Sequence, residues 1–278
     1  MSSRKRIPQQ ILKYLVLVAL SAVFMLPFFW MVRSSLLTLS QIFILPPIWV
    51  PRPAHFENYK NAMTLVPFGR YLGNTLLIAV TAILGMLFSS TISAFSFARI
   101  RWPRRNLVFG IILTSLMLPG AVTLIPQFIG WKSLGFYNTF APLIVPAYFG
   151  GGAFNIVLLR QFLMTIPKEL DEAAYVDGGT YFHIYWHVDM PLCRSAIIVV
   201  GLFAFMYHWN DFFGPLIYLE GEQKFTVALG LQQFQGNYNA QWELLMAAST
   251  VVILPAVVVF LLGQRYFIEG ITLTGIKG

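Results

Sequence analysis

Residues 71–98 read YLGNTLLIAVTAILGMLFSSTISAFSFA, a stretch without a single Asp, Glu, Lys or Arg. A helix rises about 1.5 Å per residue, so about 20 apolar residues cross the hydrocarbon core of a bilayer. The stretch is longer than that, and it is continuously apolar, unlike the alternating strands of a membrane β-barrel. It therefore predicts a membrane-spanning helix.

Five further runs of the same kind follow from reading between charged residues, and the only charge inside any of them is Asp211. Backbone in lipid has to satisfy its own hydrogen bonds, so each run is expected to be helical. The prediction is an all-α integral membrane protein with one domain over residues 1–278 and a cytoplasmic loop at 162–194. Its six transmembrane helices are expected at about 12–33, 71–98, 106–130, 137–161, 195–218 and 244–264.

Glycine and proline predict irregularities inside two of these spans. Pro119 and Pro126 are expected to kink the third span, because proline cannot donate a backbone hydrogen bond. Three consecutive glycines, residues 150–152, destabilise a helix and are expected to bend or break the fourth. Tight packing of a continuous helix is the alternative for the glycines.

Composition excludes other classes of protein. Hydrophobic residues make up 57% of the chain and charged residues 11%, and the mean hydropathy is +0.68. An ordinary soluble domain has roughly 25% charged residues, and a disordered chain has low hydrophobicity. The single cysteine, Cys193, excludes a disulfide scaffold and an all-cysteine metal site. His183 and His187 are four residues apart, but they are expected to pack within their loop, so no metal site is predicted.

Basic residues set the expected orientation in the membrane. When the spans alternate sides, one side carries 13 of the 19 Lys and Arg residues, and both termini lie on that side, the cytoplasm. These charges lie at helix ends rather than on one face, so no nucleic-acid partner is expected. The 13 are Arg4, Lys5, Arg6, Lys13, Arg99, Arg101, Arg104, Arg105, Arg160, Lys168, Arg194, Arg265 and Lys277.

The loop at 162–194 contains the sequence PKELDEAAYVDGGT at residues 167–180. Proline at the start, acids in the first turn and Gly178 as a left-handed stop predict a short helix at about 168–177. Thr180 is expected to cap a second helix over 181–189, closed by Pro191. The first helix is either a rigid acidic knob for a cytoplasmic partner or a capped linker that serves only local folding.

The residues of this loop resemble a known family. Glu172-Ala173-Ala174, then Asp177-Gly178, then a Met-Pro pair ending at Pro191 are similar to the loop of permease subunits in bacterial ABC importers. The resemblance implies a multi-pass inner-membrane protein whose loop is a coupling helix that docks on an ATP-binding subunit. It assigns that interface to Glu172, Ala173, Ala174, Asp177, Gly178 and Pro191.

The resemblance to carbohydrate (maltose-type) permeases extends to three further segments. The tail is similar to one that reaches between the ATP-binding subunits, which assigns that role to Gly275, Lys277 and Gly278. An external loop resembles the scoop that enters the sugar cleft of the binding protein, and it contains Gln232, Gln233, Phe234, Gln235, Gly236 and Asn237. Trp209, Asn210 and Asp211 are candidates for the translocation pathway, with an interfacial position as the alternative for Asp211.

The implied function is translocation of a carbohydrate, with an oligosaccharide favoured, and not enzymatic chemistry. The sequence has no phosphate-binding Gly-x-x-x-x-Gly-Lys-Ser/Thr run, so the chain itself is expected to bind no cofactor. ATP and Mg would be bound by two ATP-binding subunits. A homologous second permease subunit, an extracytoplasmic binding protein and membrane lipid complete the implied partners. The alternatives are an importer of a polyol or glycerophosphodiester, an ion-coupled secondary carrier and a membrane scaffold without transport activity.

Overall fold

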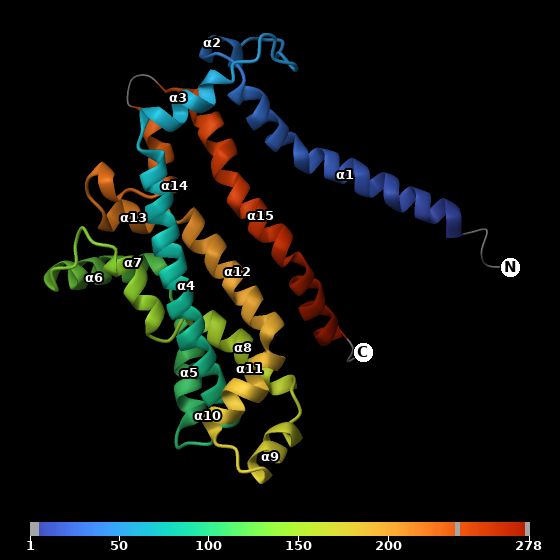
Figure 1. The fold of residues 1–278 in the computed structure, drawn as a ribbon, viewed down its shortest axis with the longest axis vertical. Helices are drawn as coiled ribbons and strands as arrows, with labels where there is room; N and C mark the ends of the chain where they lie inside the picture. Colours follow the sequence, from blue (N-terminus) through green and yellow to red (C-terminus); the bar gives the residue numbers. More distant parts are fainter. Residues whose placement is uncertain (1–5, 237–239, 276–278) are drawn as a thin grey trace. The chain divides into compact units, whose positions relative to one another are not determined.

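The computed structural model describes residues 6–236 and 240–275, and every regular element in that part of the chain is helical (Figure 1). The long helices are α1 (Arg6–Ser35), α4 (Phe68–Arg99), α12 (Arg194–Asn210) and α15 (Trp242–Gly275). The shorter α-helices are α2 (Leu39–Ile42), α3 (Glu57–Leu65), α5 (Arg105–Ser115), α6 (Gly120–Ser133), α7 (Ala141–Ile144), α8 (Ala153–Thr165), α9 (Glu169–Val176), α10 (Tyr181–Ile184), α11 (Met190–Leu192), α13 (Phe213–Tyr218) and α14 (Val227–Leu231). Single turns of other helix types are η1 (Val145–Tyr148), the π-helix η2 (Tyr185–Asp189), η3 (Glu222–Lys224) and η4 (Gln232–Gln235).

The chain divides into two compact units. The first comprises Met1–Pro67 and Leu231–Leu254, and the second comprises Phe68–Gly230 and Pro255–Gly278. Helix α15 therefore contributes residues to both units. The single domain expected over residues 1–278 stays a prediction, because two compact units can belong to one domain or to two.

Four stretches are long and apolar enough to cross a membrane as single segments: Gln10–Ser35, Phe68–Arg99, Ala141–Thr165 and Trp242–Tyr266. Two further helix pairs pass the same test but are bent, by 100° and by 76°. The prediction of an all-α protein with membrane-spanning helices is confirmed for the described residues. The described residues contain four candidate spans, or up to six if each bent pair crosses as one.

The third expected span, 106–130, is not one straight helix. Helix α5 ends at Ser115 and α6 begins at Gly120, and the two axes differ by 100°. Pro119 lies at the break with an extended backbone (φ −62°, ψ 134°). Proline has no amide hydrogen to continue the α5 ladder, so the chain turns there. Pro126 lies within α6 and does not end it.

The fourth and fifth expected spans are also interrupted. Glycines 150–152 all have positive φ values (92°, 65° and 86°) and separate η1 from α8, so the expected break is confirmed. In the fifth span, expected at 195–218, α12 ends at Asn210 and α13 begins at Phe213. The Asp211 carboxylate accepts a hydrogen bond from the Gly214 amide (3.0 Å), which satisfies a free donor at the start of α13.

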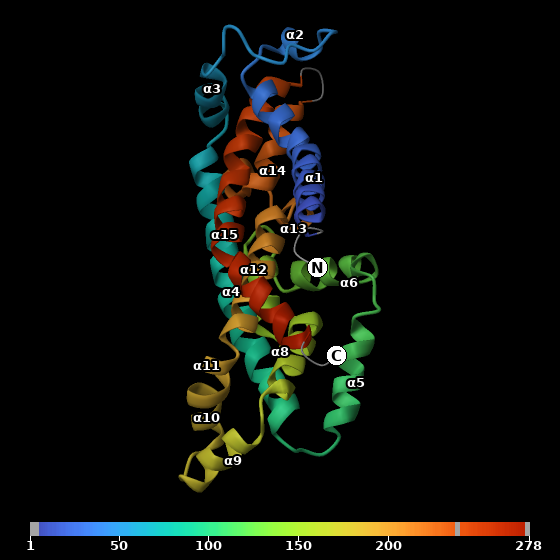
Figure 2. The same cartoon turned by 90° about the vertical axis from the view of Figure 1, so that its right-hand side faces the viewer.

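Helix α4 is the central element of the second unit. Helices α8 and α12 pack against it, and α12 runs beside α4 in both views (Figures 1 and 2). Small buried residues along α4, including Ala79, Ala82 and Ala94, allow neighbouring backbones to approach closely. At the end of α4 that is nearest α9, a buried cluster joins these helices to the loop; it contains Ala94, Phe95, Leu159, Leu163, Ile184, Tyr185 and Val200.

In the first unit, the end of α1 is joined to α3 by hydrogen bonds. The Asn58 side-chain amide donates to the carbonyls of Ser35 and Leu37, both at 2.9 Å. The hydroxyls of Ser35 and Tyr59 lie 2.7 Å apart. By contrast, residues 10–29 of α1 are exposed within this unit. Their apolar surface is that of a helix surrounded by lipid or by another subunit.

Gly151 is the most constrained glycine of the break, because it combines a positive φ with close contacts to α4. Its φ is +65°, and an added Cβ would lie 2.5 Å from the Met86 carbonyl oxygen. We expect Gly151→Ala to lower the free energy of unfolding by about 1–3 kcal/mol. Thermal unfolding of the purified chain in detergent measures the change. Gly73→Ala, in the second turn of α4 where a Cβ would meet nothing within 4 Å, is the control and should be neutral or slightly stabilising. Equal melting temperatures for the two variants would contradict the strain.

Candidate functional site

Helix α9 is a short helix closed at both ends. Its first turn contains Glu169, Asp171 and Glu172, whose negative charges stabilise a helix N-terminus. At its other end Gly178 has a φ of +84°, its amide donates to Tyr175, and the Gly179 amide donates to Ala174 (2.8 Å). This pair of bonds is the Schellman motif. The predicted helix and the left-handed conformation of Gly178 are thus confirmed.

The second helix of the loop differs from the prediction. Thr180 caps it as expected, because its hydroxyl accepts a bond from the His183 amide (3.3 Å). The helix over 181–189 is then not regular: α10 is followed by the π-helix η2 (Tyr185–Asp189). A π-turn inserts one extra residue and changes the direction of side chains, and such turns are frequent at functional sites. In this loop it accompanies the burial of both Tyr185 and Asp189.

Arg99, at the end of α4, lies at the centre of the loop. Its guanidinium bonds to Asp189 at 2.9 and 3.1 Å and to the Asp171 carboxylate at 2.9 Å. It also donates to the carbonyl oxygen of Ile166, at 3.3 and 3.4 Å. We call Arg99, Asp171 and Asp189 the arginine hub. The hub joins α4, the end of the α8 segment, α9 and the π-helix.

The hub is nearly dry. The side chains of Arg99, Asp171 and Asp189 are 4%, 11% and 0% exposed. Burial raises the pKa of Asp171, the negative charge of Asp189 raises it further, and Arg99 lowers it. Ion pairs in such surroundings carry a large desolvation cost, which only good geometry and additional hydrogen bonds offset. The bidentate contact with Asp189 supplies that geometry.

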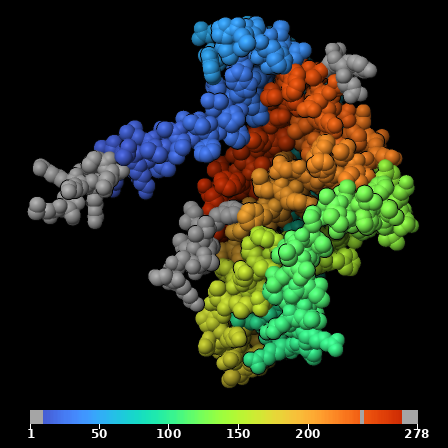
Figure 3. All heavy atoms as spheres, turned by 180° about the vertical axis from the view of Figure 1, so that it is seen from behind, coloured from blue at the N-terminus to red at the C-terminus, as the bar shows by residue number. Residues whose placement is uncertain are grey.

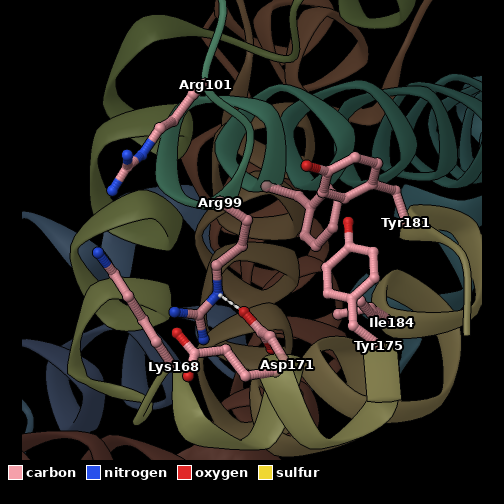
Figure 4. Close-up of a pocket in the computed structure, with 9 residues that line it drawn as sticks. Arg99, Arg101, Lys168, Asp171, Tyr175, Tyr181 and Ile184 are labelled. Atoms are coloured by element: carbon pink, nitrogen blue, oxygen red, sulfur yellow. Dashed lines mark ion pairs between the residues drawn. The ribbon is translucent and has the colours of Figure 1, made fainter. Parts of the chain in front are cut away.

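A pocket borders the hub on the side of α9 (Figure 4). Arg99 turns toward Asp171, Tyr175 and Tyr181 lie together on one side, and Arg101 and Lys168 extend on the other (Figure 4). The two tyrosine rings meet edge to face at 5.2 Å. Burial and a hydrogen bond with Tyr181 raise the pKa of Tyr175, so it stays protonated at neutral pH. The arrangement holds α9 from one side only.

The other side of α9 is free within the described part of the second unit. Ala173 and Asp177 are exposed, Ala174 is half-buried, and Val176 is 88% exposed. Glu172 is exposed as well, at the border of the hub pocket, which it helps to line. Beyond the cap, Phe182 is exposed as well. An anchored helix with a mixed acidic and apolar outer face is suited to contact another protein. No group of three or more potential metal ligands exists among the described residues.

Comparison with known proteins identifies the family. A family model described as the inner membrane component of binding-protein-dependent transport systems matches residues 90–272, which include the whole arginine hub. The chain belongs to this family. It is a permease of the inner membrane, and the resemblance found in the loop residues is confirmed.

Two relatives and one solved structure illustrate the similarity. The arabinooligosaccharides transport system permease protein AraQ of Halalkalibacterium halodurans is 32% identical over 209 residues, 75% of this chain and 74% of the relative. The sn-glycerol-3-phosphate transport system permease protein UgpE of Yersinia pestis is 32% identical over 207 residues, 74% and 73% of the two chains. A bacterial ABC transporter involved in the import of the polysaccharide alginate contains a chain with the same fold (TM-score 0.81, 21% identity, 96% and 99% covered).

The candidate pathway residues of the permease lie where α12 ends. Trp209 is buried and stacks on Phe205, with ring centres 5.3 Å apart. Asn210 is exposed and donates back to the Met206 carbonyl (2.8 Å). Asp211 is half-buried and bonds to the start of α13. The structure brings the three together, but it gives Asp211 a local structural role.

The scoop and tail residues are placed only in part. In the first unit, Gln232, Gln233, Gln235 and Gly236 are exposed, whereas Phe234 is 1% exposed. The Phe234 carbonyl accepts a bond from Gln241 (2.9 Å), so this residue anchors the segment. Gly275 ends α15, and Pro191 is exposed in α11. The predictions for Asn237, Lys277 and Gly278 fall outside the described residues.

The arginine hub was not predicted from the sequence. There Arg99 is interpreted as a charge that sets topology, Asp171 as an acid of a helix start, and Asp189 as the end of a helix with no partner assigned. A signal was present, because acids are rare in this chain: Asp and Glu number 11 in 278 residues. Asp189 lies among aromatic and apolar residues, where a charge is retained only with a partner.

The two acids of the hub should differ in their contribution to stability. Asp189 is fully buried and accepts two guanidinium bonds, whereas burial already disfavours the charged form of Asp171. We expect Asp189→Asn to lower the free energy of unfolding by about 3–5 kcal/mol, and Asp171→Asn by less. Thermal unfolding at neutral pH tests the order. Asp177→Asn, exposed at the end of α9, is the control and should have little effect. The reverse order would refute this account of the hub.

Proposed function

We propose that this chain is one of two related permease subunits of an ATP-driven importer, and that its cargo is a carbohydrate, with an oligosaccharide favoured. The main support for the proposal is the match to the transport family over residues 90–272. The substrate class is supported by the relative named for arabinooligosaccharides and by the fold shared with the alginate importer. An extracytoplasmic binding protein would deliver the sugar. The chain itself would perform no covalent chemistry and bind no cofactor.

The second candidate cargo is a glycerophosphodiester or polyol. It is favoured by one observation, the equal identity to the relative named for sn-glycerol-3-phosphate. Both candidates use the same transport cycle and differ only in the solute. Aromatic and amide side chains suit a sugar, and the exposed glutamines of the first unit are consistent with that choice.

Helix α9 is the proposed link to the two ATP-binding subunits, which would bind ATP and Mg. Ala173 and Asp177 lie on its free side, Glu172 is exposed at the border of the hub pocket, and Gly178 ends the helix. The arginine hub fastens the opposite side to α4, so a displacement of α9 would be passed to the spans rather than absorbed in the loop. Closure of the ATP-binding subunits would then move the spans between inward-open and outward-open states.

Three further roles belong to the same proposal. The segment around Gln232–Gln235 would enter the sugar cleft of the binding protein, and the end of α15 with residues 276–278 would reach between the ATP-binding subunits. Trp209, Asn210 and Asp211 would border the path of the solute. The excess of basic residues on one side supports an orientation with α9 and both termini in the cytoplasm.

Transport in liposomes tests the proposed function. The chain, purified with the partner subunits and binding protein encoded beside it, should accumulate labelled arabino-oligosaccharide only when ATP is supplied. A protonophore should not reduce this uptake. Accumulation of sn-glycerol-3-phosphate in place of the sugar would favour the second candidate. Uptake that needs no ATP and is abolished by the protonophore would identify an ion-coupled carrier and contradict the proposal.

The coupling role of α9 is tested by Glu172→Lys. The substitution reverses an exposed charge of α9, so it should weaken docking of the ATP-binding subunits by a few kcal/mol if the contact is desolvated. We expect uptake and the stimulation of ATP hydrolysis by the loaded binding protein to fall at least tenfold, with normal insertion. Glu222→Lys, an exposed acid of η3, is the control. If Glu172→Lys retains full assembly and uptake, α9 is a linker.

A further inference from the structure

A second pocket near the arginine hub is strongly basic. It is lined by Ala98, Arg99, Arg101, Arg105, Arg160, Met164 and Lys168. Arg99 belongs to the hub, and the other four cations come from separate parts of the second unit: Arg101 from the turn after α4, Arg105 from the start of α5, Arg160 from α8, and Lys168 from the residue before α9. We call Arg101, Arg105, Arg160 and Lys168 the basic pocket. Folding therefore gathers charges that are far apart in the sequence into one cavity.

The four cations of the basic pocket have no ion-pair partner among the described residues. Within residues 6–236 and 240–275, the two ion pairs present both use Arg99, and they engage Asp171 and Asp189. Glu172 lines the neighbouring pocket beside the hub together with Arg101 and Lys168, but it is exposed and forms an ion pair with neither. Like charges held together repel one another unless an anion or water screens them. The pocket therefore has an unmet preference for an anion.

Two of the arginines are held in place. The Arg160 Nε donates to the Phe97 carbonyl at 3.3 Å, and its guanidinium carbon lies 4.2 Å from the centre of the Phe109 ring. Arg105 donates to the Ile100 carbonyl at 3.0 Å. Each contact uses only part of the guanidinium donor set. The remaining N–H groups have the forked geometry that binds phosphate oxygens in pairs.

The surface next to the pocket is apolar. Helix α5 begins at Arg105, and none of its residues is buried; Leu107 and Ile111 are 63% and 62% exposed. Figure 3 shows α5 (green) at the surface, beside the yellow-green surface of the α8 segment. Trp102, an amphipathic residue typical of membrane interfaces, lies in the turn before α5 and donates to Ser96 (3.2 Å). A charged pocket thus adjoins an apolar helix face.

We propose that the basic pocket binds the phosphate of an anionic phospholipid whose acyl chains lie along α5. The phosphate matches the guanidinium donors, the apolar face of α5 matches the chains, and an inner-membrane protein is surrounded by such lipids. Basic pockets at the charged ends of transmembrane helices are known to hold anionic headgroups. Membrane orientation alone does not explain the pocket. It requires basic residues in the loops on one side of the membrane, but it does not require those residues to line one cavity.

The lipid would touch the base of α9. Lys168 directly precedes this helix, and its carbonyl accepts the amides of Asp171 and Glu172, both at 3.0 Å. A lipid held by Lys168 would steady the start of α9. This consequence for transport rests on the proposed coupling role of α9, whereas the binding itself does not.

Lipid binding to the purified full-length chain tests the site. Native mass spectrometry of the delipidated chain, with phosphatidylglycerol or phosphatidylethanolamine added back, measures the lipids retained. We expect a preference for phosphatidylglycerol that falls at least tenfold in the double variant Arg101→Gln, Lys168→Gln. Both residues are exposed, so this variant should keep its melting temperature. Arg194→Gln, an exposed cation outside the pocket, is the matched control and should keep the preference.

Three results would overturn the proposal. One is equal retention of the two lipids by the unsubstituted chain. Another is displacement of phosphatidylglycerol by millimolar inorganic phosphate with no preference among lipids, which would identify a site for free phosphate. The third is an unchanged lipid preference in the double variant together with loss of co-purifying ATP-binding subunits, which would identify a protein interface. If the double variant unfolds, Arg101→Gln alone provides the same comparison.

Discussion

The ion pairs of Arg99 are the interaction on which the second unit depends. The residue ends α4, and its guanidinium bonds to Asp171 of α9 and Asp189 of the π-helix, two acids separated by the whole loop. Because all three side chains are nearly buried, removal of Arg99 would leave two acids without their partner in a dry environment, and removal of Asp189 would take away the bidentate acceptor of the guanidinium. The loop is therefore held to the end of the longest helix of this unit by charges rather than by apolar packing alone.

The same hub explains why α9 can be short. An isolated helix of eight residues is unstable in water, because nucleation is unfavourable and so short a helix forms too few hydrogen bonds to offset it. Acids in the first turn, the glycine cap at Gly178 and the bond from Asp171 to Arg99 together replace the missing length. A helix stabilised in this way is rigid, and a rigid helix with one free side is what transmission of motion between subunits requires.

Neighbouring arginines serve different purposes at this end of the unit. Arg99 is buried and paired, whereas Arg101, Arg105 and Arg160 face a cavity without a carboxylate partner among the described residues. The difference lies in the pairing: Asp171 and Asp189 are both bound to Arg99, and no acid of the described residues forms an ion pair with the other three arginines. The ion pairs of this region are thus confined to the hub, and the guanidinium groups outside it are free to bind an anion from outside the chain.

The sequence by itself determined the class of protein, most of the span positions, the α9 helix with its Gly178 cap and the family, because these depend on local runs of apolar residues and on residues close together in the chain. Only the tertiary structure decided by how much the predicted breaks bend the chain, that the fifth span is interrupted as well, that Phe234 is buried, and that Asp171 and Asp189 share one arginine. The hub joins residues 90 positions apart, from Arg99 to Asp189. Such pairing depends on how helices pack, and no periodicity along the chain encodes it.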